Sequence, residues 1–109
     1  MNNRNVLRHL KRAKKYIDKG WCKGVLARDE YDFPVHPTDI DAVSWCAVGA
    51  LDASEDASLS TEDVKLVLHK CMKMPTITLG MFNDACKSKK DVLKLFDKAI
   101  NKLQKYDVK

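Results

Sequence analysis

The sequence lacks any long apolar run. Within its 109 residues, no uninterrupted apolar stretch approaches the roughly 18–20 residues that a membrane-spanning helix needs. The N-terminal residues carry charges but contain neither an apolar core segment nor a small-residue cleavage site, so they lack the pattern of a signal peptide. Internal repeats and low-complexity segments are absent too. We therefore expect a cytoplasmic protein without membrane contact, folded as a single domain over residues 1–109.

Closely spaced cysteine pairs are also absent. The four cysteines are far apart in the chain, and the only close combination of cysteine and histidine is Cys71 with His69. A structural zinc site typically takes its four ligands from tightly spaced pairs, so we expect no metal site, and no motif indicates a cofactor. Disulfides persist mainly in secreted proteins. We therefore expect reduced thiols at all four positions, which are Cys22, Cys46, Cys71 and Cys86.

Each part of the chain is short of one sign of charge. Residues 1–24 hold eight basic residues and one acid, residues 25–64 hold one basic residue and ten acids, and residues 65–109 hold eleven basic residues and four acids. The net charge of +5 is that of a basic protein, which suggests an anionic partner. Because the blocks of opposite sign can neutralise one another within the fold, the net charge supports nucleic-acid binding only weakly.

Apolar residues at helical spacing predict three amphipathic helices. The first covers residues 3–19, and Gly20 stands where a left-handed helix stop is expected. Another begins after Ser60 and ends before Pro75, because proline ends a helix at or before the preceding residue. The last begins after Ser88, where Ser-x-x-Asp forms a capping box. The first and last of these helices carry most of the basic residues.

A fourth helix is expected from Thr38 onward. Thr38-x-x-Asp41 reads as a capping box, and residues 42–51 are apolar nearly all round, which is typical of a helix enclosed by others. Gly49 costs this helix about 1 kcal/mol relative to alanine, so we expect another backbone to approach closely there. We therefore predict a mainly α fold, a compact bundle of about four helices around this apolar central helix.

Two segments break the helical pattern. Residues 20–37 read as a loop, with a possible short β-hairpin at 25–36 whose turn is residues 29–32. Residues 75–88 contain a stretch that fits either one short helix or an extended segment, and Asn83-Asp84 reads as a turn. Loops on a rigid scaffold are where function usually sits, so we look for a site there.

Three clusters of residues stand out from the helical background. They are Gly20-Trp21-Cys22-Lys23-Gly24 followed by Arg28-Asp29, then Trp45-Cys46-Ala47-Val48-Gly49-Ala50-Leu51, and last Phe82-Asn83-Asp84. In this order and at these separations, the clusters resemble a small uncharacterised family of bacterial and bacteriophage proteins, a domain of unknown function. The resemblance covers nearly the whole chain, and the Trp-Cys-Ala-x-Gly-Ala-Leu string is more specific than Asn-Asp alone.

The sequence departs from the family pattern at two positions. Phe82 stands where many relatives have tryptophan, and Asp32 stands where a glycine often follows the acidic turn. Neither difference removes a polar site residue. The resemblance implies a shared fold and a shared polar site but no established activity. It also suggests an accessory, phage-encoded factor that modulates a host or counters its defences.

Our first functional hypothesis is a non-catalytic binding protein. Residues from the two loops would converge beside the central helix and hold a small ligand or a segment of a partner protein, because indole rings supply contact area and polar groups supply orientation. The candidate residues are Trp21, Arg28, Asp29, Trp45, Asn83 and Asp84. Taken singly, each also has a structural explanation as a core residue, a turn residue or a cap.

Two alternatives come from other classes. One is a nucleic-acid-binding protein that uses the basic first and last helices, with candidate residues Arg4, Arg8, Lys11, Arg12 and Lys15. The low aromatic content of 7% and the acidic middle block argue against it. The other is a thiol enzyme with Cys46 as nucleophile and His36 or His69 as base, oriented by Asn83 or Asp84. Its weakness is the expected position of Cys46, two turns inside a helix and far from the positive end of the helix dipole.

Overall fold

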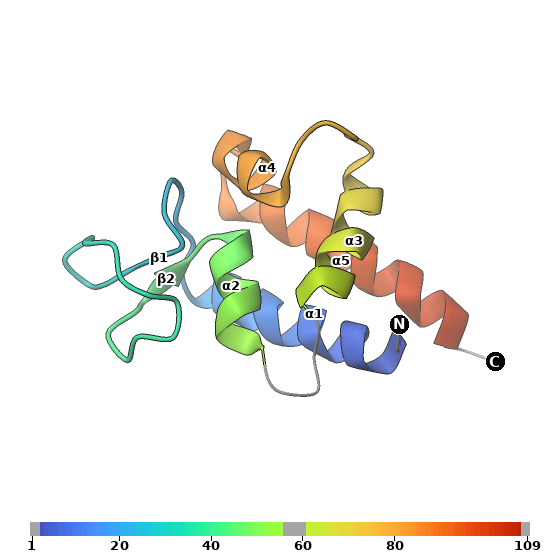
Figure 1. Cartoon of the computed structure of the whole chain (residues 1–109), viewed down its shortest axis with the longest axis horizontal. Helices are drawn as coiled ribbons and strands as arrows, with labels where there is room; N and C mark the ends of the chain where they lie inside the picture. Colours follow the sequence, from blue (N-terminus) through green and yellow to red (C-terminus); the bar gives the residue numbers. More distant parts are fainter. Residues whose placement is uncertain (1–2, 56–60, 108–109) are drawn as a thin grey trace.

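The computed structural model describes residues 3–55 and 61–107, and it is mainly helical (Figure 1). In these residues there are five helices and one two-stranded sheet. The helices are α1 (Asn3–Lys19), α2 (Ala47–Ser54), α3 (Thr61–Met72), α4 (Leu79–Ala85) and α5 (Lys89–Asp107). The strands are β1 (Ala27–Arg28) and β2 (Ser44–Trp45), which pair antiparallel. The predicted mainly α fold is confirmed, and none of the described helices is long and apolar enough to cross a membrane.

The long helices α1 and α5 lie side by side, and α1 also packs on α2 (Figure 1). The predicted apolar stripe of α1 is buried, with Leu10 and Ile17 fully inside. Phe96 of α5 is the largest fully buried side chain. Burying each such side chain contributes about 1.5–3 kcal/mol, so this shared core is the main stabilising element of the fold.

One buried polar contact joins α1 to the end of α2. The imidazole Nε2 of His9 lies 2.8 Å from the carbonyl oxygen of Leu51, so it is the donor. The last carbonyls of a helix have no partner within the helix, and the carbonyl of Leu51 is one of these. The hydroxyl of Ser54 lies 2.7 Å from the Ala50 carbonyl oxygen and 3.2 Å from that of Leu51, and it donates between the two. His9 and Ser54 thus satisfy a helix end that lies in the core.

The prediction of a helix from Thr38 is wrong. Thr38 hydrogen-bonds with the ring of His36 instead of capping a helix, and Asp39 Oδ1 accepts from the Asp41 amide. The chain therefore turns twice and then forms β2. The helix begins only after Cys46, whose Sγ accepts a hydrogen bond from the Gly49 amide as the N-cap. The all-round apolar pattern arose because a buried strand runs directly into a buried helix.

The expected hairpin is present, but its sheet partner differs from the prediction. The chain reverses at residues 29–32, and the Val35 amide donates to the Ala27 carbonyl at 3.0 Å. The named sheet, however, pairs Ala27 with Trp45 and Arg28 with Ser44. The remaining ambiguous segment forms α4, whose N-cap is Thr78. Asn83 and Asp84 therefore lie in a helix and not in a turn.

Two glycines allow close approaches between segments. A Cβ on Gly49 would lie 1.9 Å from the carbonyl oxygen of Leu26, so the predicted close approach of another backbone is confirmed. A Cβ on Gly20 would lie 2.1 Å from the carbonyl oxygen of Val43. Gly20 is not the left-handed stop that the sequence suggested, because Gly24 is the only described glycine with a positive φ. Both glycines thus let the β1–β2 region pack against the ends of α1 and α2.

We expect Gly49→Ala and Gly80→Ala to have different effects. A Cβ at position 49 must displace the Leu26 carbonyl, which also accepts from the Cys46 amide, so the free energy of unfolding should fall by about 3 kcal/mol or more. At position 80 the nearest atom is 3.9 Å away, and alanine favours the helix by up to about 1 kcal/mol. Urea unfolding of both variants measures this, and equal losses would contradict the close approach.

Candidate functional site

Asn83 lies at the centre of the predicted polar site. It is on α4, and its side chain is fully buried. Its Oδ1 accepts from the indole Nε1 of Trp21 at 2.8 Å and from the Ala47 amide at 2.9 Å. Its Nδ2 donates to the Cys22 carbonyl at 3.1 Å and to Asp84 Oδ1 at 3.3 Å. An asparagine side chain offers two donors and two acceptor positions, so all four are used within the protein.

The position of Asn83 follows from the local sequence. Thr78 Oγ1 accepts from the Met81 amide and begins α4, while the buried Leu79 fixes its orientation on the core. The amide of Ala47 is in the first turn of α2 and has no partner within that helix. Asn83 supplies that partner, so it acts as a cap for α2 from a different segment of the chain.

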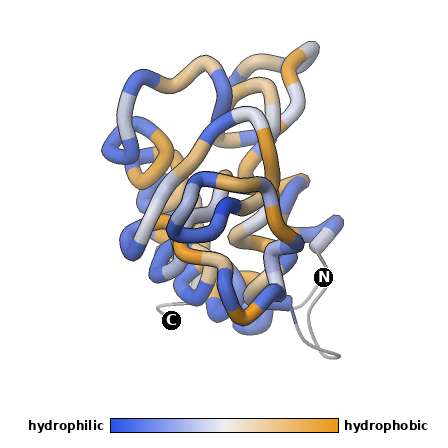
Figure 2. Tube along the Cα trace, turned by 90° about the vertical axis from the view of Figure 1, so that its left-hand side faces the viewer, coloured by the Kyte–Doolittle hydropathy of each residue, from blue (hydrophilic) through white to orange (hydrophobic). Residues whose placement is uncertain are grey.

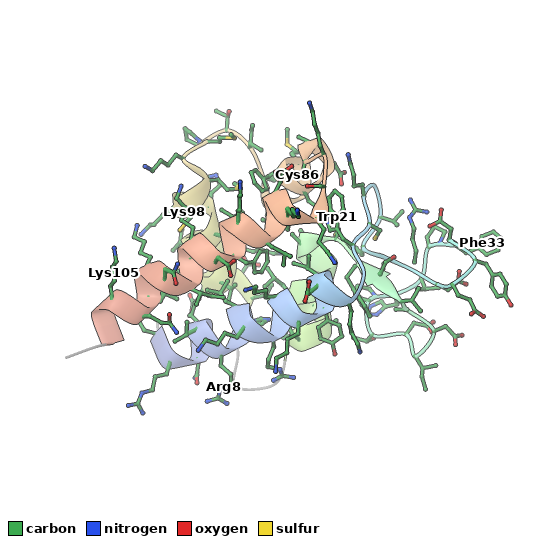
Figure 3. All side chains as sticks on the ribbon, turned by 180° about the vertical axis from the view of Figure 1, so that it is seen from behind. Arg8, Trp21, Phe33, Cys86, Lys98 and Lys105 are labelled. Carbon is green, nitrogen blue, oxygen red and sulfur yellow. The ribbon has the colours of Figure 1, made fainter. Side chains whose placement is uncertain are left out.

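Asp84 and Lys23 extend this network to the loop after α1. Asp84 Oδ1 accepts from the Gly24 amide at 2.9 Å, although the Asp84 side chain is exposed. Lys23 Nζ donates to the Cys86 carbonyl at 2.7 Å and lies 5.7 Å from the centre of the Trp21 ring. Figure 3 shows Trp21 and Cys86 close together, beside the start of α5. The first and third sequence clusters therefore meet in space.

Trp45 is a core residue. Its side chain is 5% exposed, and its ring packs edge-on against Tyr16 with 4.8 Å between the ring centres. Its indole Nε1 donates to the Pro37 carbonyl at 3.0 Å. A single bridge pairs its backbone with Trp21, so it lies beside the Asn83 network without presenting a polar group to solvent.

Arg28 and Asp29 form no hydrogen bond with Asn83 and instead shape the loop that follows β1. Arg28 donates from Nη1 to the Asp32 carbonyl at 3.0 Å and from Nη2 to the Lys23 carbonyl at 3.1 Å. Asp29 Oδ1 accepts from the amides of Tyr31 and Phe33, both at 2.9 Å. Asp32 has a φ of 70°, which is the left-handed conformation that glycine adopts most easily. Glycine would therefore suit this position, where the resemblance indicated that relatives often carry one.

The sequence prediction missed the surface that these two residues support. We call residues 25–43 the loop lobe; it projects from the helices at the β1–β2 end of the molecule (Figure 1). Five of the eight large apolar side chains that are exposed in the described chain lie in it. The most exposed are Ile40 at 97%, Tyr31 at 73% and Phe33 at 66%. Figure 3 shows Phe33 at its outer end, and Figure 2, which faces this end of the molecule, shows both apolar and polar stretches along its loops.

The loop lobe is also acidic. Glu30, Asp32, Asp39 and Asp41 are all exposed, and Arg28 is the one basic residue between positions 25 and 43 apart from His36. The guanidinium group of Arg28 is engaged with the loop itself. A signal for this surface was present in the sequence as apolar residues set among acids without helical or strand periodicity.

The basic residues proposed for nucleic-acid binding lie along α1. Arg4, Arg8, Lys11 and Lys15 are exposed, and Arg12 is half-buried. Clefts on this helix are lined by acids as well as bases, with Asp18 lining two of them and Asp97 one. Ion pairs of Lys14 with Asp97 and of Lys89 with Asp18 also join α1 to α5. Part of the positive charge of α1 is thus paired with acidic residues of the same chain.

The thiol hypothesis rested on a wrong position for Cys46. Because Cys46 is the N-cap of α2, it does lie at the positive end of a helix dipole. Its side chain is nevertheless buried, and burial raises the pKa of the Cys46 thiol above its ordinary value of 9.0, although the hydrogen bond from Gly49 lowers it in part. Burial also raises the pKa of Cys22 and of Cys86. These thiols are therefore mostly protonated at neutral pH, unlike activated nucleophiles.

No disulfide and no cluster of three metal-ligating side chains occurs among the described residues. The four cysteines there are all free and buried.

We expect Asn83→Ala to destabilise the fold severely. The substitution leaves the Ala47 amide, the Trp21 indole and the Cys22 carbonyl without their partner, at about 1–3 kcal/mol for each buried group, so a loss of 3 kcal/mol or more is expected. Asp84→Asn is the matched control, because an amide oxygen can still accept from Gly24. Chemical unfolding measures both, and a loss below about 1 kcal/mol for Asn83→Ala would contradict the structural role.

We also expect the thiols of the folded protein to react slowly. Since burial raises their pKa, iodoacetamide at about pH 8 should label Cys22, Cys46 and Cys86 well below the rate for a free cysteine, and fully only after unfolding. Peptide mapping by mass spectrometry identifies the labelled positions. Rapid labelling of Cys46 in the folded protein would restore the nucleophile hypothesis.

Comparison with known proteins places the chain in a family. A family described as "Family of unknown function (DUF6197)" matches residues 1–102, which include all three sequence clusters and most of α5. Searches of curated proteins and of solved structures found no significant match. The match spans almost the entire chain. The chain therefore belongs to DUF6197, a family of unknown function.

Proposed function

We propose that this chain is a non-catalytic binding protein whose loop lobe docks on a partner protein. The observation that carries the proposal is the exposure of Tyr31, Phe33 and Ile40 on one projecting segment. Monomeric proteins rarely leave several large apolar side chains together in solvent without a functional reason. Aromatic residues are also enriched among the side chains that contribute most to protein–protein affinity.

The fixed conformation of the loop lobe supports this proposal. The side chains of Arg28 and Asp29 hold the turn at residues 29–33 through hydrogen bonds to three of its backbone groups, and Arg28 also donates to the Lys23 carbonyl outside the turn. The Val43 amide donates to the Arg28 carbonyl at 2.8 Å and ties the far end of the lobe to its start. A loop that is already ordered loses less conformational entropy on binding, so its apolar contacts contribute more to affinity.

The charge of the loop lobe indicates the chemistry of the partner. Its four exposed acids surround the apolar side chains with negative charge. Complementary charge accelerates encounter and excludes partners of like sign. We therefore infer a partner protein that presents apolar pockets bordered by lysine or arginine.

Binding of a small ligand at the Asn83 network is a less favoured version of the binding-protein hypothesis. Each hydrogen-bonding position of Asn83 is used by the protein, and the indole groups of Trp21 and Trp45 are both donating. A ligand would have to displace these bonds. The network instead joins the loop after α1 to α2 and α4. A cytoplasmic location and a phage-encoded, host-modulating role stay predictions from the sequence and its resemblance.

A photo-cross-linking amino acid at position 33 tests the proposal. When the protein with the cross-linker at position 33 is incubated with lysate of the natural cells, it should capture one partner protein. A control protein with the cross-linker at the exposed Leu66 of α3 should not capture that partner. The captured protein, once purified, should bind the unmodified chain. We expect Phe33→Ser and Ile40→Ser each to weaken that binding by about tenfold or more. Isothermal titration calorimetry gives the affinities.

The controls separate docking from folding. Because Phe33 and Ile40 are exposed, their variants should unfold within about 0.5 kcal/mol of the parent, and Leu66→Ser should change neither stability nor affinity. Asp39→Lys with Asp41→Lys should also weaken binding, most strongly at low salt. Unchanged affinity in the lobe variants, or capture of a second copy of this chain at position 33, would overturn the proposal.

A further inference from the structure

A second surface, distant from the loop lobe, is lined by lysines. It is a groove of about 590 Å³ between the end of α3 and the second half of α5. Its charged lining residues are Lys70 and Lys73 on one side and Lys98, Lys102 and Lys105 on the other. Asn101 and Cys71 complete the lining as far as the structure describes side chains, and this described lining contains no carboxylate and no aromatic ring. We call this the lysine groove.

The positive charge of the lysine groove is not neutralised by the described part of the chain. None of its five lysines has an ion-pair partner there, whereas basic residues at the α1–α5 contact pair with Asp18 and Asp97. Lys98 and Lys102 are four residues apart on one helix, a spacing at which like charges repel by a few tenths of a kcal/mol. A counter-charge from outside would relieve this repulsion.

The lysines of α5 form a row. From Lys98 to Lys105 the helix rises by about 10 Å at 1.5 Å per residue. Figure 3 shows Lys98 and Lys105 projecting to the same side of α5, away from Arg8 on α1. Lys70 and Lys73 lie at the carbonyl end of α3, whose partial negative charge they offset. The surplus positive charge therefore belongs mainly to the α5 row.

We propose that the lysine groove binds the phosphate backbone of a nucleic acid without reading its base sequence. Each strand of a DNA duplex presents a charge about every 3.4 Å along the helix axis, so the row spans about three phosphates at that spacing. Lysine is a flexible point charge that suits phosphate, while sequence readout needs groups that reach base edges or stack on bases. No aromatic ring lines the groove among the side chains of residues 3–55 and 61–105, which favours contacts to the backbone over stacking on bases.

The acidic loop lobe of a second copy fits the lysine groove poorly. Its exposed Phe33 and Ile40 would need apolar pockets, and among the described lining residues of the groove Cys71 alone is apolar. This proposal is independent of the proposed function, since the two surfaces share no residue. Loss of one binding activity would leave the other in place.

The test compares two variants with the same change in net charge. The groove variant carries Lys98→Gln, Lys102→Gln and Lys105→Gln, and the control carries Arg8→Gln, Lys11→Gln and Lys15→Gln on the exposed face of α1. Fluorescence anisotropy with a labelled mixed-sequence DNA strand of about 20 nucleotides, and with its duplex, gives affinities between about 50 and 200 mM salt. Circular dichroism confirms that both variants fold, as expected for exposed lysines.

The parent should bind the strand with a slope of log affinity against log salt near −2, the value for about three phosphate contacts. At the lowest salt, the groove variant should bind about tenfold or more weakly than the parent, and its affinity should depend much less on salt. The α1 control should lose less than about threefold in affinity. A second strand of unrelated sequence should bind equally. The proposal would be overturned if the two variants lost affinity equally or if the α1 control lost more. It would also be overturned by binding that does not depend on salt, or by competition from inorganic polyphosphate but not from unlabelled DNA.

Discussion

The hydrogen bonds of the buried Asn83 side chain hold together three segments of the chain. Its amide joins the exit of α1, the first turn of α2 and its own helix α4. Every donor and acceptor position is filled inside a buried site, where an unpaired polar group is costly. The side chain therefore fixes how α4 sits over the loop after α1. The base of the loop lobe depends on that placement, because β1 follows directly from this loop.

Much of the fold could be predicted from periodicity. The apolar stripe of α1, the end of α3 before Pro75 and the start of α5 after Ser88 were predicted from local signals, and the structure has all three. The segment from Thr38 to Cys46 could not be predicted, because its conformation is decided by distant partners. Trp45 donates to Pro37 and pairs with β1, and these contacts outweigh the local capping pattern.

The sequence predicted which residues come together at the candidate site, but it did not predict what their polar groups bind. Trp21, Asn83 and Asp84 do come together, yet their polar groups bind one another and the backbone. Residue types indicate which hydrogen bonds are possible. Only the structure shows whether those hydrogen bonds are already made within the protein. Tyr31, Phe33 and Ile40 stand among acids without a periodic pattern, so the sequence carried a signal for them, but their exposure was established only by the structure.

In the proposed arrangement, the hydrogen bonds of Asn83 stabilise the scaffold, and the projecting loop lobe contacts the partner protein. Native-state hydrogen exchange of the Ala47 amide and the Trp21 indole tests this most directly. If Asn83 holds both groups permanently, each should exchange only through openings close in free energy to global unfolding. Exchange of both at nearly unprotected rates would show that Asn83 is free to bind a ligand, and would contradict the account.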